Sequence, residues 1–167
     1  MTKLDHAIEF ATAAHQGQVR KYTHAPYIMH PMAVMQIVKS VPHTEEMLMA
    51  AVLHDTVEDT DVTMQDINDK FGTVVGMYVE YLTDISTLKD GNRKLRKRKD
   101  ALHYAQGPAE SQTIKVADFI HNTQDIKRFA PNFWEVYKVE KWEALQYLRK
   151  ADNGLWLRAE KQIKELW

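Results

Sequence analysis

Four polar side chains that could hold a metal ion and activate water occur within one short stretch of the chain: His54, Asp55, Glu58 and Asp59. If this stretch is helical, they spread over an arc of roughly 140°, because each residue of an α-helix turns by about 100°. Three carboxylates at this spacing would repel one another, and a divalent cation would relieve the repulsion. The alternative is a solvated acidic face, but two acids one turn after a His-Asp pair favour a metal site.

A second polar group shares one face of a predicted helix, and its members are Lys115, Asp118, His121, Asn122 and Asp125. An amphipathic surface helix would look similar. Asp118 could be a further metal ligand, and Asn122 lies one turn later, where it could contact a ligand or substrate. The chain has no cysteine, so nitrogen and oxygen atoms must hold any metal.

Residues 16–31 contain a third group of candidate residues. His30 lies at the predicted start of a helix, where a single histidine is more often a capping or packed imidazole than a metal ligand. Arg20 and Lys21, beside Tyr27, could bind an anionic ligand and stack on a base. Each of these interpretations is weak for a residue considered alone.

Composition limits the classes of protein and of partner. The length of 167 residues is that expected for one domain with a sizeable core, and the net charge of −1 argues against a general nucleic-acid binder. Residues 93–99 hold six basic side chains, which form either a solvated helix face or a phosphate-binding edge. No stretch has the roughly 18 apolar residues of a membrane span. The absence of cysteine fits the cytoplasm, and the sequence indicates no protein partner.

Helical periodicity dominates the chain, which predicts one all-α domain over residues 1–167. The helix carrying His54 and Asp55 is expected to begin after Thr44, an N-terminal capping residue. The other predicted helices cover residues 2–16, 31–39, 63–71, 73–82, 93–105, 109–128, 132–150 and 153–166.

The motifs occur in a recognisable order. They comprise residues 16–21, 26–31 and 53–60, followed by 116–118 with His121 and Asn122. This order resembles the hydrolase domain of the RelA/SpoT family, within the HD-domain metal phosphohydrolases. The length resembles the small alarmone hydrolases, and residues 82–94 look most similar to the metazoan SpoT homologue type. The resemblance spans roughly residues 4–150.

The resemblance implies a single-domain, all-helical HD bundle with a bound manganese ion. Its ligands would be His30, His54, Asp55 and Asp118. Mixed nitrogen and oxygen ligands are consistent with manganese, although iron, zinc or cobalt could also bind.

The implied reaction releases pyrophosphate from the 3′ position of ppGpp or pppGpp. Glu58 and Asp59 match the paired acids that activate the attacking water in the family. The matching nucleotide contacts are Arg20, which would stack on the base, and Lys21, Asn122, Arg93, Lys138 and Trp142. The implied partner is therefore a nucleotide substrate, with no role for nucleic acid or a membrane.

Three positions depart from the family pattern. Phe119 stands where the family often has a basic residue, directly after the aspartate of the third motif. Residues 23–25 form a shortened loop that lacks the usual glycine, and Asp84 replaces a bacterial lysine, as in the metazoan type. These departures could change which nucleotide binds.

Three other functions are compatible with the residues. The first is an HD phosphatase of another nucleotide, such as a ppApp-type alarmone or NADPH. The second is a nucleotide sensor without turnover, although retention of both Glu58 and Asp59 argues against it. The third is a helical RNA-binding module that uses residues 93–99, for which salt-sensitive binding would be diagnostic.

Overall fold

Helices account for nearly all regular structure in residues 1–165, the part of the chain that the computed structural model describes. In chain order they are α1 (Lys3–Ala14), α2 (Met29–Lys39), α3 (Glu45–Leu53), α4 (Thr56–Asp59), α5 (Met64–Phe71), α6 (Thr73–Leu82), the 3-10 helix η1 (Leu88–Asp90), α7 (Arg93–Gln106), α8 (Ala109–Phe129), α9 (Pro131–Tyr147) and α10 (Asn153–Lys164). The only β-type pairing in these residues is an isolated bridge between Val19 and Pro26. The predicted all-α fold is confirmed.

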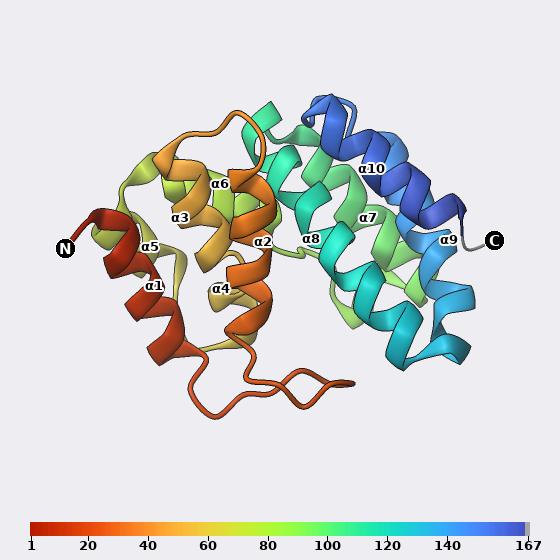
Figure 1. Cartoon of the computed structure of the whole chain (residues 1–167), viewed down its shortest axis with the longest axis horizontal. Coiled ribbons are helices and arrows are strands. Elements are labelled where there is room, and N and C mark those ends of the chain that lie inside the picture. Colours follow the sequence, from red (N-terminus) through yellow and green to blue (C-terminus); the bar gives the residue numbers. More distant parts are fainter. Residues whose placement is uncertain (166–167) are drawn as a thin grey trace.

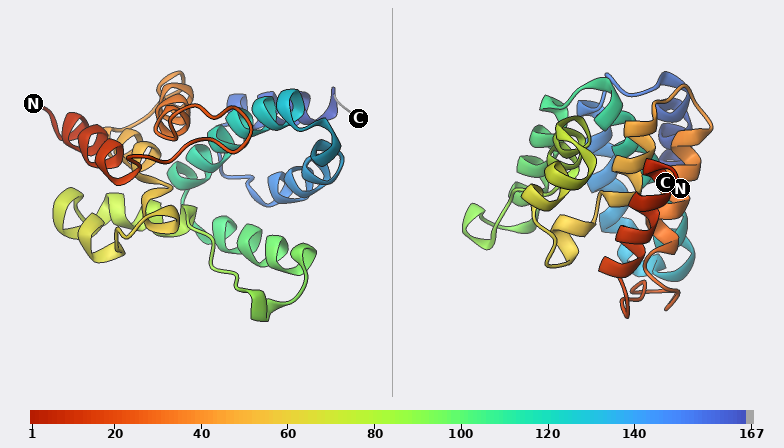
Figure 2. Two further views of the ribbon diagram at one scale, coloured as in Figure 1. Left: turned by 90° about the horizontal axis from the view of Figure 1, so that it is seen from below. Right: turned by 90° about the vertical axis from the view of Figure 1, so that its left-hand side faces the viewer.

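Helix α8 forms the centre of the molecule, with α1 to α6 on one side and α7, α9 and α10 on the other (Figure 1). The two further views agree with this arrangement (Figure 2). Twelve of the 21 residues of α8 are buried, and among them are Lys115 and Asp118. A buried charge is costly unless it has a partner, so these two side chains need partners inside the protein.

Two side chains end helix α3 earlier than the sequence suggested. The predicted helix was continuous through His54 and Asp55, but α3 ends at Leu53 and α4 begins at Thr56. His54 Nδ1 lies 2.7 Å from the Ala51 carbonyl oxygen, and the Thr56 hydroxyl donates to the Leu53 carbonyl at 2.8 Å. These contacts compete with the hydrogen bonds of a continuing helix. The expectation of one unbroken helix was wrong, and His54 and Asp55 lie at a turn.

The remaining boundaries differ little from the predicted ones. Thr44 and Thr63 cap α3 and α5 through their side chains, as their sequence positions indicated. Gly72, with a φ of 93°, connects α5 to α6 in a backbone conformation that favours glycine. The last helix ends at Lys164, and residue 166, where the predicted helix ended, lies outside the described residues. None of the helices in residues 1–165 combines the length and apolarity that spanning a membrane would require.

Candidate metal and catalytic site

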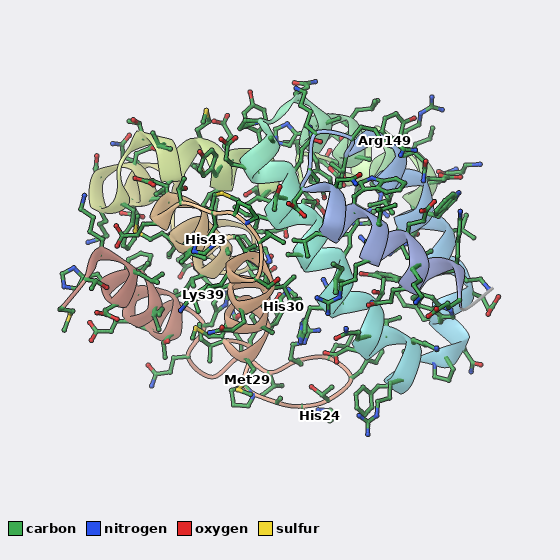
Figure 3. The ribbon with its side chains drawn as sticks, turned by 45° about the horizontal axis from the view of Figure 1, so that its top comes forward. His24, Met29, His30, Lys39, His43 and Arg149 are labelled. Carbon is green, nitrogen blue, oxygen red and sulfur yellow. The ribbon has the colours of Figure 1, made fainter. Side chains whose placement is uncertain are left out.

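Four side-chain atoms converge where α2, α8 and the α3–α4 turn meet. His30 is in the first turn of α2 (Figure 3), and Asp118 lies near the middle of α8. His30 Nε2 is 3.0 Å from Asp118 Oδ1 and 3.6 Å from Asp55 Oδ2. His54 Nε2 is 3.1 Å from Asp55 Oδ2 and 3.6 Å from Asp118 Oδ1. The structure therefore brings together the four residues predicted as metal ligands.

These separations suit ligands of a single cation. Two atoms that each lie about 2.1 Å from one metal ion are about 3.0 to 3.4 Å apart in octahedral or tetrahedral geometry. His54 Nε2 is buried and makes no hydrogen bond of good geometry. It is therefore available to a cation. The set of two imidazoles and two carboxylates fits a divalent metal that accepts nitrogen and oxygen ligands.

Neighbouring groups hold the imidazoles in the orientation that a metal needs. Because a carbonyl oxygen only accepts hydrogen bonds, His54 Nδ1 donates to Ala51, and Nε2 is the nitrogen that faces the site and would bind a metal. His30 Nδ1 lies 2.7 Å from His121 Nδ1, and the two rings stack. Burial and the nearby His30 lower the pKa of His121 to about 4. A neutral His121 can therefore accept the Nδ1 proton of His30.

The charges of the site favour a bound cation. Burial opposes ionisation of Asp55 and Asp118, but His54 beside Asp55, and Lys115 beside Asp118, lower the pKa of both carboxyl groups. Burial would lower the pKa of His54, but the same two carboxylates raise it well above its usual value. Two ionised carboxylates in a buried site require compensating positive charge, which a divalent ion would supply.

Tyr27 and Lys115 hold the two carboxylates in place. The Tyr27 hydroxyl donates to Asp55 Oδ2 at 2.7 Å, and burial raises its pKa, so the proton stays on the phenol. Lys115 Nζ lies 3.5 Å from Asp118 Oδ2 and 4.2 Å from the centre of the Tyr104 ring. Sequence reasoning assigned no such role to either residue, although Lys115 was placed on the same helix face as Asp118.

Glu58 and Asp59 reach solvent beside the ligand atoms, and together with Asp55 they form a second group of carboxylate oxygens within 4.8 Å of one another. Glu58 Oε1 accepts the backbone N–H of Asp84 at 3.0 Å. Partial burial and the charge of Asp84 raise the pKa of Glu58 to about 7. Partial burial and Asp55 also raise the pKa of Asp59. A carboxyl group with a pKa near neutrality can accept and release a proton.

The predicted base-binding loop lies against α8. Arg20 donates to Asn122 Oδ1 at 3.1 Å and to Asp125 Oδ2 at 2.8 Å, so the structure brings Arg20 and Asn122 together. Asn122 in turn donates to Asp118 Oδ1 at 2.7 Å. Lys21 is exposed, with its ammonium group over the Tyr22 ring.

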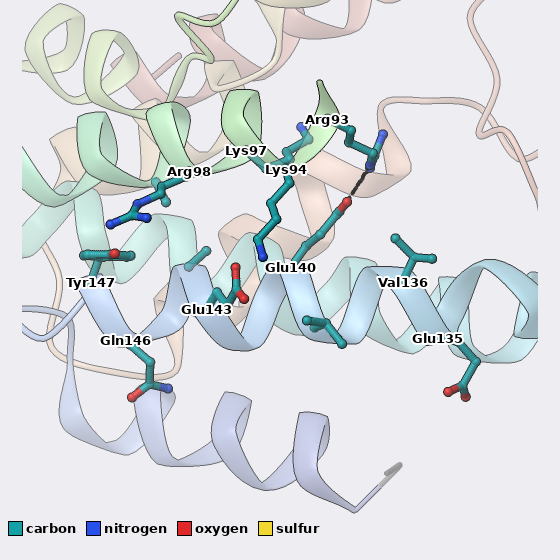
Figure 4. A pocket seen from close by; sticks show the side chains of 13 residues that line it. Arg93, Lys94, Lys97, Arg98, Glu135, Val136, Glu140, Glu143, Gln146 and Tyr147 are labelled. Atoms are coloured by element: carbon teal, nitrogen blue, oxygen red, sulfur yellow. Dashed lines mark hydrogen bonds and ion pairs between the residues drawn. The ribbon is translucent and has the colours of Figure 1, made fainter. Parts of the chain in front are cut away.

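The other three predicted nucleotide contacts lie on or beside α9. Arg93 forms an ion pair with Glu140 at 2.5 Å, at a groove of about 800 Å³ between α7 and α9 (Figure 4). The buried Lys138 pairs with Glu135 at 2.7 Å. The Trp142 ring has Lys164 of α10 4.8 Å from its centre.

Comparisons with known proteins agree with this geometry. The sequence profile of the HD domain matches residues 7–138. The chain is 34% identical over 165 residues to the guanosine-3′,5′-bis(diphosphate) 3′-pyrophosphohydrolase MESH1 of Mus musculus, covering 96% of this chain and 90% of the mouse protein. It is 33% identical over 144 residues to the protein with the same activity name from Aquifex aeolicus, covering 81% of this chain but only 20% of that relative.

A solved structure of a metazoan orthologue of SpoT, described as hydrolysing ppGpp and acting in starvation responses, superposes with a TM-score of 0.87 at 29% identity. The superposition covers 99% of this chain and 96% of that one. The helical fold is thus shared over nearly the full length of both chains. The chain belongs to the HD-domain family and is homologous over nearly its full length to the metazoan MESH1 proteins.

Proposed function

We propose that this protein is a manganese-dependent 3′-pyrophosphohydrolase of ppGpp and pppGpp, formed by one HD domain over residues 1–167. The observation that carries the proposal is the convergence of His30, His54, Asp55 and Asp118 beside Glu58. The activity named for relatives that match most of the chain supports the choice of substrate. The proposed substrate is a cytoplasmic nucleotide, and we propose the same compartment for the protein.

The four ligand side chains would hold the metal, which supplies a polarised phosphoryl oxygen and a water of lowered pKa. Glu58 accepts a proton from the attacking water, and Asp59 helps to orient that water. The water oxygen bonds to the phosphorus next to the ribose 3′ oxygen, and the bond between that phosphorus and the 3′ oxygen breaks. The 3′ oxygen takes up a proton, which gives GDP or GTP and pyrophosphate.

Arg20 and Asn122 hold the nucleoside part of the substrate. Arg20 is fixed by Asp125, which keeps its guanidinium group extended beside Asn122, where it can stack on a purine ring. Lys21, Arg93, Lys138 and Trp142 are further proposed contacts to the phosphates or the base. Arg93 and Lys138 must exchange part of their present ion pairs to take this role.

The test is a turnover assay of the purified, metal-stripped protein with and without added manganese. ppGpp should yield equal amounts of GDP and pyrophosphate only when manganese is present. In water enriched in oxygen-18 the label should enter the pyrophosphate, because the water attacks phosphorus. ppApp and NADPH serve as comparison substrates under the same conditions. Rapid turnover of either of these without any hydrolysis of ppGpp would contradict the proposed substrate.

A further inference from the structure

The ammonium group of Lys141 lies between two aromatic rings at the edge of the candidate site. Lys141 Nζ is 4.5 Å from the centre of the Phe119 ring and 4.9 Å from that of Tyr137. Phe119 directly follows the ligand Asp118, and it occupies the position where the family often has a basic residue. A lysine of α9 thus places a positive charge against α8, beside the ligand Asp118.

The cations nearest to Lys141 differ from it in having carboxylate partners. Lys97 pairs with Asp84 at 3.3 Å, and Lys115 pairs with Asp118 at 3.5 Å. Within residues 1–165 no carboxylate lies within ion-pair distance of Lys141. Its ammonium group instead contacts the two aromatic rings. Aromatic rings attract an ammonium ion but leave its hydrogen-bond donors available, so Lys141 can bind an anion without breaking an ion pair.

The charges that act on Lys141 come from residues close to the ligand set. Along α8, Arg20 contacts Asn122 and Asp125, which follow Asp118. Lys115 precedes Asp118 by one turn, and the charges that act on Lys141 include those of Lys97 and Lys115. The base-binding residues follow Asp118 by one turn or more, whereas Lys141 packs on Phe119, directly beside Asp118, and is close enough to Lys115 for their charges to interact.

We propose that Lys141 binds the 3′-diphosphate group of the substrate. This inference rests on the proposed function, because it needs the nucleoside at Arg20 and the ester phosphorus at the four ligand side chains. The second phosphate then extends toward Lys141 and Lys97. The rings of Phe119 and Tyr137 hold the ammonium in place before the substrate arrives.

The charge state of Lys141 suits this role. Burial lowers its pKa to about 8, and the carboxylates of Asp118 and Asp84 act in the opposite direction. The group therefore remains mostly protonated at neutral pH. Because Lys141 is partly buried against two rings, its ammonium is already partly desolvated, which favours a charge-assisted hydrogen bond to a phosphate.

The experiment measures binding of inorganic pyrophosphate and of GDP to the full-length, manganese-loaded protein by calorimetry, and kcat/KM for ppGpp. Lys141→Met should weaken pyrophosphate binding at least about 10-fold, the effect of losing one hydrogen bond to a charged group, and should leave GDP binding unchanged. Lys141→Arg should restore most of the affinity, because a guanidinium group also stacks on aromatic rings and binds phosphate. Lys161→Met, at an exposed pair on α10, is the matched control.

Two results would overturn the inference while leaving the proposed function intact. One is equal pyrophosphate binding and equal ppGpp turnover in Lys141→Met and the wild type. The other is an equal loss of pyrophosphate and GDP binding with a lowered melting temperature, which would make Lys141 a structural link between α8 and α9. Failure of the wild type to hydrolyse ppGpp would instead contradict the proposed function, and a selective loss of pyrophosphate binding would still identify Lys141 as a diphosphate contact.

Discussion

Partial burial and the negative charge of Asp84 raise the pKa of Glu58 to about 7, although its carboxylate accepts one backbone hydrogen bond, which acts in the opposite direction. No metal ligand depends on it, because the ligand atoms come from His30, His54, Asp55 and Asp118. Its chemistry can therefore be separated from metal binding by a single substitution.

Glu58→Gln should retain manganese and nucleotide binding but lower kcat at least about 10²-fold, because an amide of nearly the same shape cannot accept a proton. Calorimetric titration with manganese and steady-state kinetics on ppGpp measure the two properties. Glu9→Gln, on the exposed side of α1, is the control. Turnover near the wild-type rate in Glu58→Gln would remove Glu58 from the mechanism.

Lys141 gives a pH dependence whose sign follows from its environment. Its pKa is about 8 in the folded protein and near 10.5 in the unfolded chain. Between these values the unfolded chain binds more protons, so this group makes the folded protein more stable as pH rises from about 8 to 10.5. The difference in unfolding free energy between wild type and Lys141→Met should therefore shift in favour of the wild type between pH 7.5 and about 10.5. A constant difference in urea titrations at the two pH values would contradict this expectation.

The resemblance implied the four proposed ligands, and the residue types and spacing alone pointed to His54, Asp55 and Asp118, but neither identified the supporting residues. His30, His54, Asp55 and Asp118 carry side chains that bind metals, and the structure brings them together. The contact between Lys141 and Phe119 joins α9 to α8, and no local pattern in the sequence reports such a contact between two helices. Likewise, only the packing of α2 against α8 places His121 beside His30.

At the scale of elements, a buried aspartate of α7 fixes the loop that carries Asp84. Asp100 is 1% exposed and accepts hydrogen bonds from the backbone N–H groups of Ile85 and Ser86 and from the Ser86 hydroxyl, at 2.8 to 3.0 Å. Because Asp84 contacts Glu58 through its own N–H, the position of this loop affects the catalytic carboxyl group.

Asp100→Ala should lower the free energy of unfolding by about 2–4 kcal/mol, because it removes the three hydrogen bonds of a buried carboxylate to part-buried donors. Denaturation by urea measures the loss, and ppGpp turnover should fall as the loop moves. Asp90→Ala, which removes an exposed acceptor at η1, is the control and should have a much smaller effect. Equal stability of the two variants would show that the Asp100 hydrogen bonds do not hold the loop.

Helix positions followed from periodicity and capping residues, whereas the break between α3 and α4 did not. Thr44 and Thr63 are typical caps, and they begin α3 and α5 as predicted. At His54 and Asp55 nothing in the sequence resembles a helix breaker, since there is no glycine or proline. The break depends on hydrogen bonds from His54 and Thr56 to the preceding carbonyl groups, and each could also have pointed to solvent.

At the scale of the whole molecule, the four ligands join α2, α8 and the turn after α3, so a bound ion connects elements that are distant in the chain. Manganese at 100 times its dissociation constant should stabilise the folded protein by about 2.7 kcal/mol and raise the melting temperature by about 5–10 °C. Asp118→Asn should abolish most of this increase. Thermal unfolding with manganese or with a chelator measures it, and an equal increase in the variant would place the stabilising ion elsewhere.

The order of the ligands along the chain also has a consequence for protein synthesis. His30, His54 and Asp55 are made early, and Asp118 follows 63 positions after Asp55, which corresponds to about 3–12 s of translation at about 5–20 residues per second. Until α8 has been made and has docked, a nascent chain offers only three of the four ligands, without the helix that buries them. If the four proposed ligands bind a metal, we expect metal acquisition to follow folding, and we expect the bound ion to reflect the metals available in the cell at that moment.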